Sequence, residues 1–81
     1  MSDRDTVKDS VFKLIEQFNK KGVDVTEETR FAQDLEWDSL TVLDFVAEVE
    51  DEFDILITMN QQAEIEKVGQ LVDAVTEMAN K

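Results

Sequence analysis

Apolar residues recur at helical spacing in three parts of the chain. In residues 5–18, 39–53 and 68–80 they return every three or four positions. This period places them on one face of an α-helix, and such a face is stable only when another element covers it. The pattern therefore predicts three helices that pack against one another.

The segments between these helices differ from one another. Residues 20–38 are mostly polar and show no sustained period, which predicts a long first loop. Residues 60–65 suit one or two helical turns, and the apolar run 55–57 stands alone, where a single strand cannot satisfy its backbone groups. We therefore predict an all-α four-helix bundle with a long first loop and a short third helix. The isolated apolar side chains expected to hold the loop to the core are Val23, Val25, Phe31 and Leu35.

Capping residues mark the expected helix ends. Ser2 or Asp3 can cap the first helix, and Gly22 can stop it. Asp38 can cap the second helix, because its short acceptor side chain suits the free N–H groups of a first helical turn. These positions set the boundaries of the two longest predicted helices.

Composition limits what the chain can be. It has 81 residues, no proline, two glycines and no cysteine, so we expect residues 1–81 to form a single domain without disulfides. No apolar run approaches the roughly 20 residues of a membrane span. The polar start lacks the basic and then apolar pattern of a secretory signal. The cytoplasm is the expected compartment.

The formal net charge of −12 restricts the possible partners. It opposes binding to nucleic-acid phosphates and to anionic membranes, so basic protein surfaces are the natural partners. The alternative is that the acidity only keeps a small protein soluble. The position of the charges has to decide between these interpretations.

The second predicted helix carries two different faces. The residues expected to enter the core are Val42, Phe45, Val46, Val49 and Phe53, with Leu43 at the edge. Asp44, Glu48 and Asp51 fall together on the other side, and we call them the acidic strip. Leu40 and Ala47 lie beside this strip.

The acidic strip is unfavourable for helix stability. Like charges four residues apart, such as Asp44 and Glu48, destabilise a helix by about 0.2–0.5 kcal/mol per pair. Glu50, Asp51 and Glu52 also crowd the negative end of the helix dipole. Such costs favour a partner-binding surface. No calcium-loop spacing is present, so we expect no metal site.

Ser39 stands at the start of the second helix, directly after Asp38. A serine there is commonly an N-cap, but Asp38 fills that role as well. The chain has no histidine or cysteine to activate a hydroxyl, which argues against a catalytic nucleophile and against an enzyme. An attached phosphate group would suit the positive end of a helix dipole. Ser39 is therefore a candidate attachment point.

The segment FAQDLEWDSLTVLDFVAEVEDEFDILI, residues 31–57, resembles the acyl carrier proteins. Their mark is Asp-Ser-Leu at the start of the second helix of a four-helix bundle, followed by a hydrophobic and acidic helix. The resemblance extends over residues 7–80 and includes the later spacing of Ile65 and Val68. The combination is more specific than the tripeptide alone.

The resemblance implies a covalent cofactor. A phosphopantetheinyl transferase would move 4'-phosphopantetheine from coenzyme A to Ser39, between Asp38 and Leu40. The terminal thiol would then carry acyl groups as thioesters for fatty-acid or specialised lipid synthesis. Acyl-loading, synthase and acyltransferase enzymes with basic surfaces would dock on Leu40, Ala47 and the acidic strip. We expect a monomer.

The resemblance also implies that the acyl chain can be sheltered between the helices. The residues expected to line that pocket are Val42, Leu43, Val46, Val49, Phe53, Ile57 and Ile65.

Three residues depart from the usual family pattern. Glu36 stands where glycine is usual, Trp37 replaces a smaller apolar residue, and Thr58 replaces a frequent proline. Trp37 is either a loop anchor, which we favour, or a contact for a particular partner. The departures favour a carrier dedicated to one pathway, similar to specialised bacterial lipid carriers such as those that feed sphingoid-base synthesis.

Two alternatives stay open at the level of sequence. One is an aminoacyl or peptidyl carrier, against which the net charge argues. The other is an acidic helical adaptor that is never modified, in which Ser39 only caps a helix.

Overall fold

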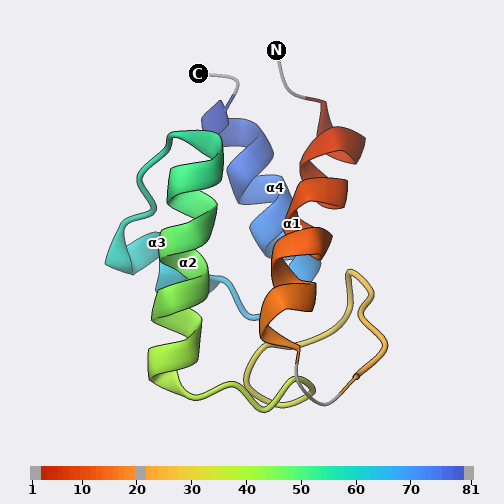
Figure 1. Cartoon of the computed structure of the whole chain (residues 1–81). Coiled ribbons are helices and arrows are strands. Elements are labelled where there is room, and N and C mark those ends of the chain that lie inside the picture. The colour runs from red at the N-terminus through yellow and green to blue at the C-terminus, as the bar shows by residue number, and fades with distance from the viewer. Residues whose placement is uncertain (1–2, 20–21, 80–81) are drawn as a thin grey trace.

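The computed structural model describes residues 3–19 and 22–79, and within these ranges it contains four helices and no multi-residue strand (Figure 1). The helices are α1 (Arg4–Phe18), α2 (Ser39–Phe53), α3 (Met59–Glu64) and α4 (Val68–Ala79). This confirms the predicted all-α bundle with a long first loop and a short third helix. The predicted end of the last helix at Asn80 lies outside the described residues.

The core forms where α1 packs against both α2 and α4 (Figure 1). The apolar stripes predicted from the sequence supply it, because burial of these side chains is what stabilises an amphipathic helix. Its fully buried members are Val7, Val11, Ile15, Phe45, Val49, Val68, Leu71, Val72 and Val75. The short α3 contributes no buried residue.

Aspartates cap the two longest helices. The Asp3 carboxylate accepts a hydrogen bond from the backbone N–H of Thr6 at 2.9 Å, and Asp38 accepts one from Thr41 at 2.8 Å. Each bond satisfies a donor that has no partner inside the helix. Both predicted caps are confirmed for the aspartates, whereas the alternative cap Ser2 lies outside the described residues.

Thr58 starts α3 through a reciprocal capping box. Its hydroxyl accepts the backbone N–H of Gln61 at 3.1 Å, and the Gln61 side chain accepts the N–H of Thr58 at 3.0 Å. The T-x-x-Q spacing is a sequence signal for this arrangement, which the sequence analysis missed. The residue that replaces a frequent proline therefore still begins the helix.

The first loop is held to the core by apolar side chains, as predicted. Phe31 and Leu35 are buried, and Val23 and Val25 pack against the core while partly exposed. Trp37 is only 9% exposed. Its ring centroid lies 5.8, 5.5 and 5.1 Å from those of Phe18, Phe31 and Phe45, respectively. These contacts support the interpretation of Trp37 as a loop anchor.

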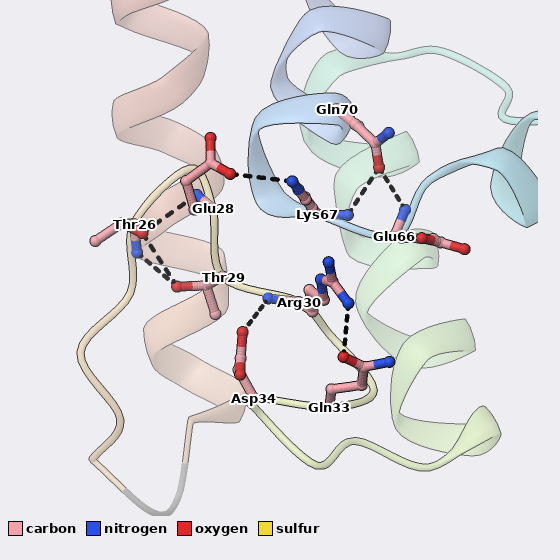
Figure 2. Close-up of polar contacts among 9 residues, drawn as sticks. All are labelled: Thr26, Glu28, Thr29, Arg30, Gln33, Asp34, Glu66, Lys67 and Gln70. Carbon is pink, nitrogen blue, oxygen red and sulfur yellow. Dashed lines mark hydrogen bonds and ion pairs between the residues drawn. The ribbon is translucent and has the colours of Figure 1, made fainter.

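The loop also supplies hydrogen-bond acceptors to the start of α4. The backbone N–H of Val68 donates to the carbonyl of Thr29, and that of Gly69 donates to the carbonyl of Glu27, both at 2.9 Å. Figure 2 shows the neighbouring polar contacts, including the ion pair between Lys67 and Glu28 at 3.0 Å. Loop carbonyls thus accept N–H groups of the first turn of α4, while the Gln70 side chain accepts those of Glu66 and Lys67 just before it, at 2.8 and 2.9 Å.

Alanine at position 69 is expected to weaken this junction. A Cβ atom on Gly69 would lie 3.1 Å from both the Cβ and the carbonyl oxygen of Glu27. Since a backbone oxygen cannot rotate away, the added methyl group should cost about 1–3 kcal/mol, of which the higher helix propensity of alanine offsets up to about 1 kcal/mol. We therefore expect Gly69→Ala to lower the free energy of unfolding in urea titrations by a net amount of about 0.5–2 kcal/mol. The control Glu77→Ala changes an exposed residue of α4 and should stay within about 0.5 kcal/mol of the parent. Equal stability of Gly69→Ala and the parent would contradict a tight junction.

Candidate functional site

Ser39 is the first residue of α2, and its side chain is exposed. The helix cap next to it is Asp38, whose carboxylate accepts the Thr41 N–H. Among residues 3–19 and 22–79, no hydrogen bond engages the Ser39 hydroxyl. The hydroxyl is therefore accessible at the positive end of the α2 dipole and is not needed as a cap.

The charge of Asp38 is fixed by this geometry. The Thr41 N–H holds the pKa of Asp38 below its usual value, because the hydrogen bond stabilises the ionised carboxylate. Asp38 is therefore a carboxylate at neutral pH, immediately before Ser39.

The acidic strip of Asp44, Glu48 and Asp51 is exposed along α2. None of the three carboxylates has an ion-pair or hydrogen-bond partner in the part of the chain that the structure describes. Leu40 beside the strip is 67% exposed, and Ala47 is exposed as well. This placement matches the one expected from the helical period, and it leaves the negative charge unneutralised.

Glu50 has a different role from the strip. Its carboxylate accepts the backbone N–H of Ile57 at 2.8 Å. This contact ties the end of α2 to the segment before α3. One of the carboxylates crowded at the α2 C-terminus thus has a structural use that the sequence did not indicate.

An apolar crevice lies between α2, α3, α4 and the first loop. Its lining consists of Phe31, Val42, Phe45, Val46, Gln62, Ile65 and Leu71. The cavity holds about 20 Å³, which is room for about one water molecule. The crevice is therefore closed to an acyl chain in this structure.

Three of the residues predicted to line an acyl pocket border this crevice: Val42, Val46 and Ile65. The other four lie elsewhere: Val49 and Ile57 are buried, Phe53 is partly buried, and Leu43 is 51% exposed. The sequence marked Phe45 and Leu71 as core and Phe31 as a loop anchor, but it gave no sign that they meet at this crevice. They meet there because the first loop, α2 and α4 pack against one another.

A wider cavity of about 220 Å³ adjoins the crevice and shares Phe31, Val42 and Ile65 with it. Polar side chains of Arg30, Gln33 and Glu66 surround this outer cavity. The Arg30 guanidinium donates to the Gln33 side chain at 2.8 Å, as Figure 2 shows. The outer cavity, which is the expected entrance to the crevice, is thus mostly apolar with these polar side chains at its border.

A third cavity, of about 340 Å³, lies next to the start of α2. Its lining includes Trp37, Asp38 and Thr41 together with Glu36. Glu36 has a φ of 57°, in the left-handed region that favours glycine. This backbone conformation gives a physical reason for the glycine that the family usually has here.

In the part of the chain that the structure describes, no helix is long and apolar enough to cross a membrane. Histidine, cysteine or carboxylate side chains do not gather in groups of three or more that can hold a metal ion in residues 3–19 and 22–79.

The pH dependence of stability follows from three carboxylates. Hydrogen bonds from Thr6 and Thr41 and contact with Arg4 lower the pKa of Asp3, Asp38 and Glu27, respectively. The stability that these groups contribute is present above their unfolded pKa values and is lost as the pH falls through the lower folded values. The excess of negative charge acts oppositely, because protonation relieves its repulsion.

We therefore expect a melting temperature that rises from pH 7 toward about pH 4.5 and falls below about pH 4. Sodium chloride should raise the melting temperature at pH 7, where repulsion is strongest, and should change it less at pH 4.5. Circular dichroism melts across pH and salt measure both effects. A stability gain that requires one divalent ion at stoichiometric amounts would contradict a general screening effect.

Comparisons with known proteins point to one family. The family model described as "Phosphopantetheine attachment site" matches residues 10–75 of the chain. The acyl carrier protein of Borreliella burgdorferi strain ZS7 is 35% identical over 74 residues, which cover 90% of this chain and 92% of that protein. The crystal structure of the acyl carrier protein from Thermotoga maritima is 35% identical, with a TM-score of 0.73 and 91% of each chain covered.

A further solved structure supports the fold alone. The toxoplasma-specific mitochondrial acyl carrier protein is 24% identical to this chain, with a TM-score of 0.85. The match covers 98% of this chain and 93% of that protein.

The family model and the relatives cover most of the chain, and the matched range includes Asp38, Ser39 and Leu40. The chain therefore belongs to the acyl carrier proteins, the carriers of a covalently attached phosphopantetheine group.

Proposed function

We propose that Ser39 is the sole attachment residue for 4'-phosphopantetheine. The observation that carries this proposal is the exposed hydroxyl at the start of α2, which makes no hydrogen bond in the described structure. Asp38 already caps the helix, so modification of Ser39 removes no interaction on which the fold depends. The whole chain, residues 1–81, would then act as one carrier domain.

In the attachment reaction the Ser39 oxygen bonds to the phosphorus of the phosphopantetheine arm. The bond from that phosphorus to the adenosine part of coenzyme A breaks, and the hydroxyl proton passes to a base of the transferase. The chain contains no histidine or cysteine, so both the base and the sulfur chemistry come from outside it. Acyl groups then travel as thioesters on the terminal thiol.

Incubation with coenzyme A and a phosphopantetheinyl transferase tests the proposal. We expect intact-mass spectrometry to show one added phosphopantetheine on the parent protein and none on Ser39→Ala. Ser2 and Ser10 are the only other serines, and Ser10→Ala serves as the matched control that keeps full modification. Modification that persists in Ser39→Ala would overturn the assignment.

The acidic strip is proposed as the docking surface for the transferase and for synthases and acyltransferases with basic surfaces. Its support is the exposure of Asp44, Glu48 and Asp51 and their lack of partners within the described ranges. Exposed Leu40 beside Ser39 adds an apolar contact. Charge complementarity of this kind raises association rates, and a desolvated apolar residue adds affinity.

The closed crevice is proposed as the shelter for the acyl chain. It must open, because its present volume of about 20 Å³ admits no chain. The element best suited to move is α3, since it is short and contributes no buried residue. Displacement of α3 away from α2 would join the crevice to the outer cavity of about 220 Å³, with which it shares Val42 and Ile65.

A further inference from the structure

Neighbouring glutamines of α3 have different surroundings. The Gln61 side chain closes the capping box with Thr58 and is thereby used by the fold. The Gln62 side chain is half-buried and lines the apolar crevice. Its carboxamide makes no hydrogen bond to any described residue. The structure of α3 therefore explains Gln61 but not Gln62.

Gln62 is the only polar residue that lines the crevice within the described ranges. In the closed state water can satisfy its carboxamide, because the side chain is partly exposed. An unsubstituted acyl chain that entered the crevice would cover this carboxamide and displace its water. The chain offers no hydrogen bond in return, so the buried carboxamide would be left without a partner, which is unfavourable. A chain with a hydroxyl or oxo group would supply the missing partner, since a carboxamide both donates and accepts.

The entrance of the crevice is compatible with such a substituent. The outer cavity is bordered by Arg30, Gln33 and Glu66, and it shares Val42 and Ile65 with the crevice. A polar group that passes this entrance keeps hydrogen-bonding partners on its way, while the apolar part of the chain lies against the shared side chains. The outer cavity thus combines a mostly apolar lining with several polar side chains, whereas among the described residues the crevice has the single carboxamide of Gln62.

We propose that Gln62 is a specificity-determining residue. It makes the carrier shelter acyl chains with a hydroxyl or oxo substituent better than unsubstituted chains of equal length. The inference rests on the proposed function, because the cargo must be attached through Ser39. It assigns to one side chain a preference that an all-apolar crevice would lack.

The test uses the modified protein loaded with either an octanoyl or a β-hydroxyoctanoyl group. Cleavage of each thioester by hydroxylamine is measured and normalised to the same acyl group on free pantetheine, which gives a protection factor. We expect the hydroxylated cargo to be protected about fivefold better in the parent, the factor that corresponds to one net hydrogen bond. Gln62→Leu and Gln62→Met should remove this difference, because leucine forms no hydrogen bond and the methionine sulfur is only a weak acceptor.

Gln61→Leu is the matched control. It breaks the capping box and should lower protection of both cargoes equally while the difference between them persists. Equal protection of the two cargoes in the parent would overturn the inference. So would a difference that survives in both Gln62 variants or disappears in Gln61→Leu. Intact mass confirms that both acyl groups are attached through Ser39, so failure of attachment is seen separately from failure of the preference.

Discussion

Charge reversal of the acidic strip is expected to slow modification of Ser39 at least tenfold at low ionic strength. The variant is Asp44→Lys combined with Glu48→Lys. Both carboxylates are exposed, and neither is paired in the described structure, so they act on an approaching basic surface without local neutralisation. Electrostatic steering raises association rates by about 10- to 1,000-fold and weakens as salt screens it. The measurement is the modification rate with a phosphopantetheinyl transferase across a series of salt concentrations.

A control for net charge accompanies this variant. Asp9→Lys with Glu16→Lys changes the net charge equally, but at exposed positions of α1. If steering depends on the strip, this control should be modified nearly as fast as the parent. If both double variants are modified more slowly by the same factor, only the total charge matters. If Asp44→Lys with Glu48→Lys is modified as fast as the parent, the acidic strip is a solvent-exposed face that does not take part in docking.

The fold should tolerate the reversal. The reversal exchanges one like-charge pair at positions 44 and 48 for another, but a lysine at position 48 gains Asp51 and Glu52 as neighbours of opposite charge three and four residues away. Melts should therefore show equal or slightly higher stability. Leu40→Ala should also slow modification, but with little dependence on salt, because the lost contact is apolar. The two salt profiles therefore separate the charged part of the surface from its apolar part.

Local signals explain why most of the fold could be predicted. The stripe and the cap of α2 are both encoded within a few residues, and the helix spans Ser39–Phe53, as predicted from the sequence. The same holds for α1, which begins at Arg4, one residue before the predicted start. The missed capping box at Thr58 was also local and was available from its spacing to Gln61.

Contacts between distant segments could not be predicted in this way. The hydrogen bonds from Val68 and Gly69 to loop carbonyls depend on how the first loop crosses α4. The crevice depends on how α3 packs, and nothing in the spacing of Gln62 indicates that it lines this crevice. The candidate attachment site was predictable because Ser39 lies at a helix start, whereas the proposed cargo shelter was predictable only in part, because it is assembled from four segments.

Trp37→Ala is expected to remove much of the stability of the domain. The ring is buried and packs on Phe18, Phe31 and Phe45, three rings that belong to α1, the loop and α2. Loss of a buried tryptophan costs about 3–5 kcal/mol through lost burial and a cavity. Native domains have only about 5–15 kcal/mol of stability, so a large part of it is at stake. Urea titration followed by circular dichroism measures the change, with Leu56→Ala, at a residue 82% exposed, as a near-neutral control.

The same variant decides between the two interpretations of Trp37. An anchor holds the loop that leads into Asp38 and Ser39, so its loss should lower stability and slow modification together. Trp37→Phe should restore most of both, because a smaller ring still packs on the cluster. A residue that serves only as a partner contact would behave differently: Trp37→Ala would keep the stability of the parent and lose only its modification rate. The burial of the ring favours the first outcome, since a side chain with only 9% exposure offers little surface to a partner.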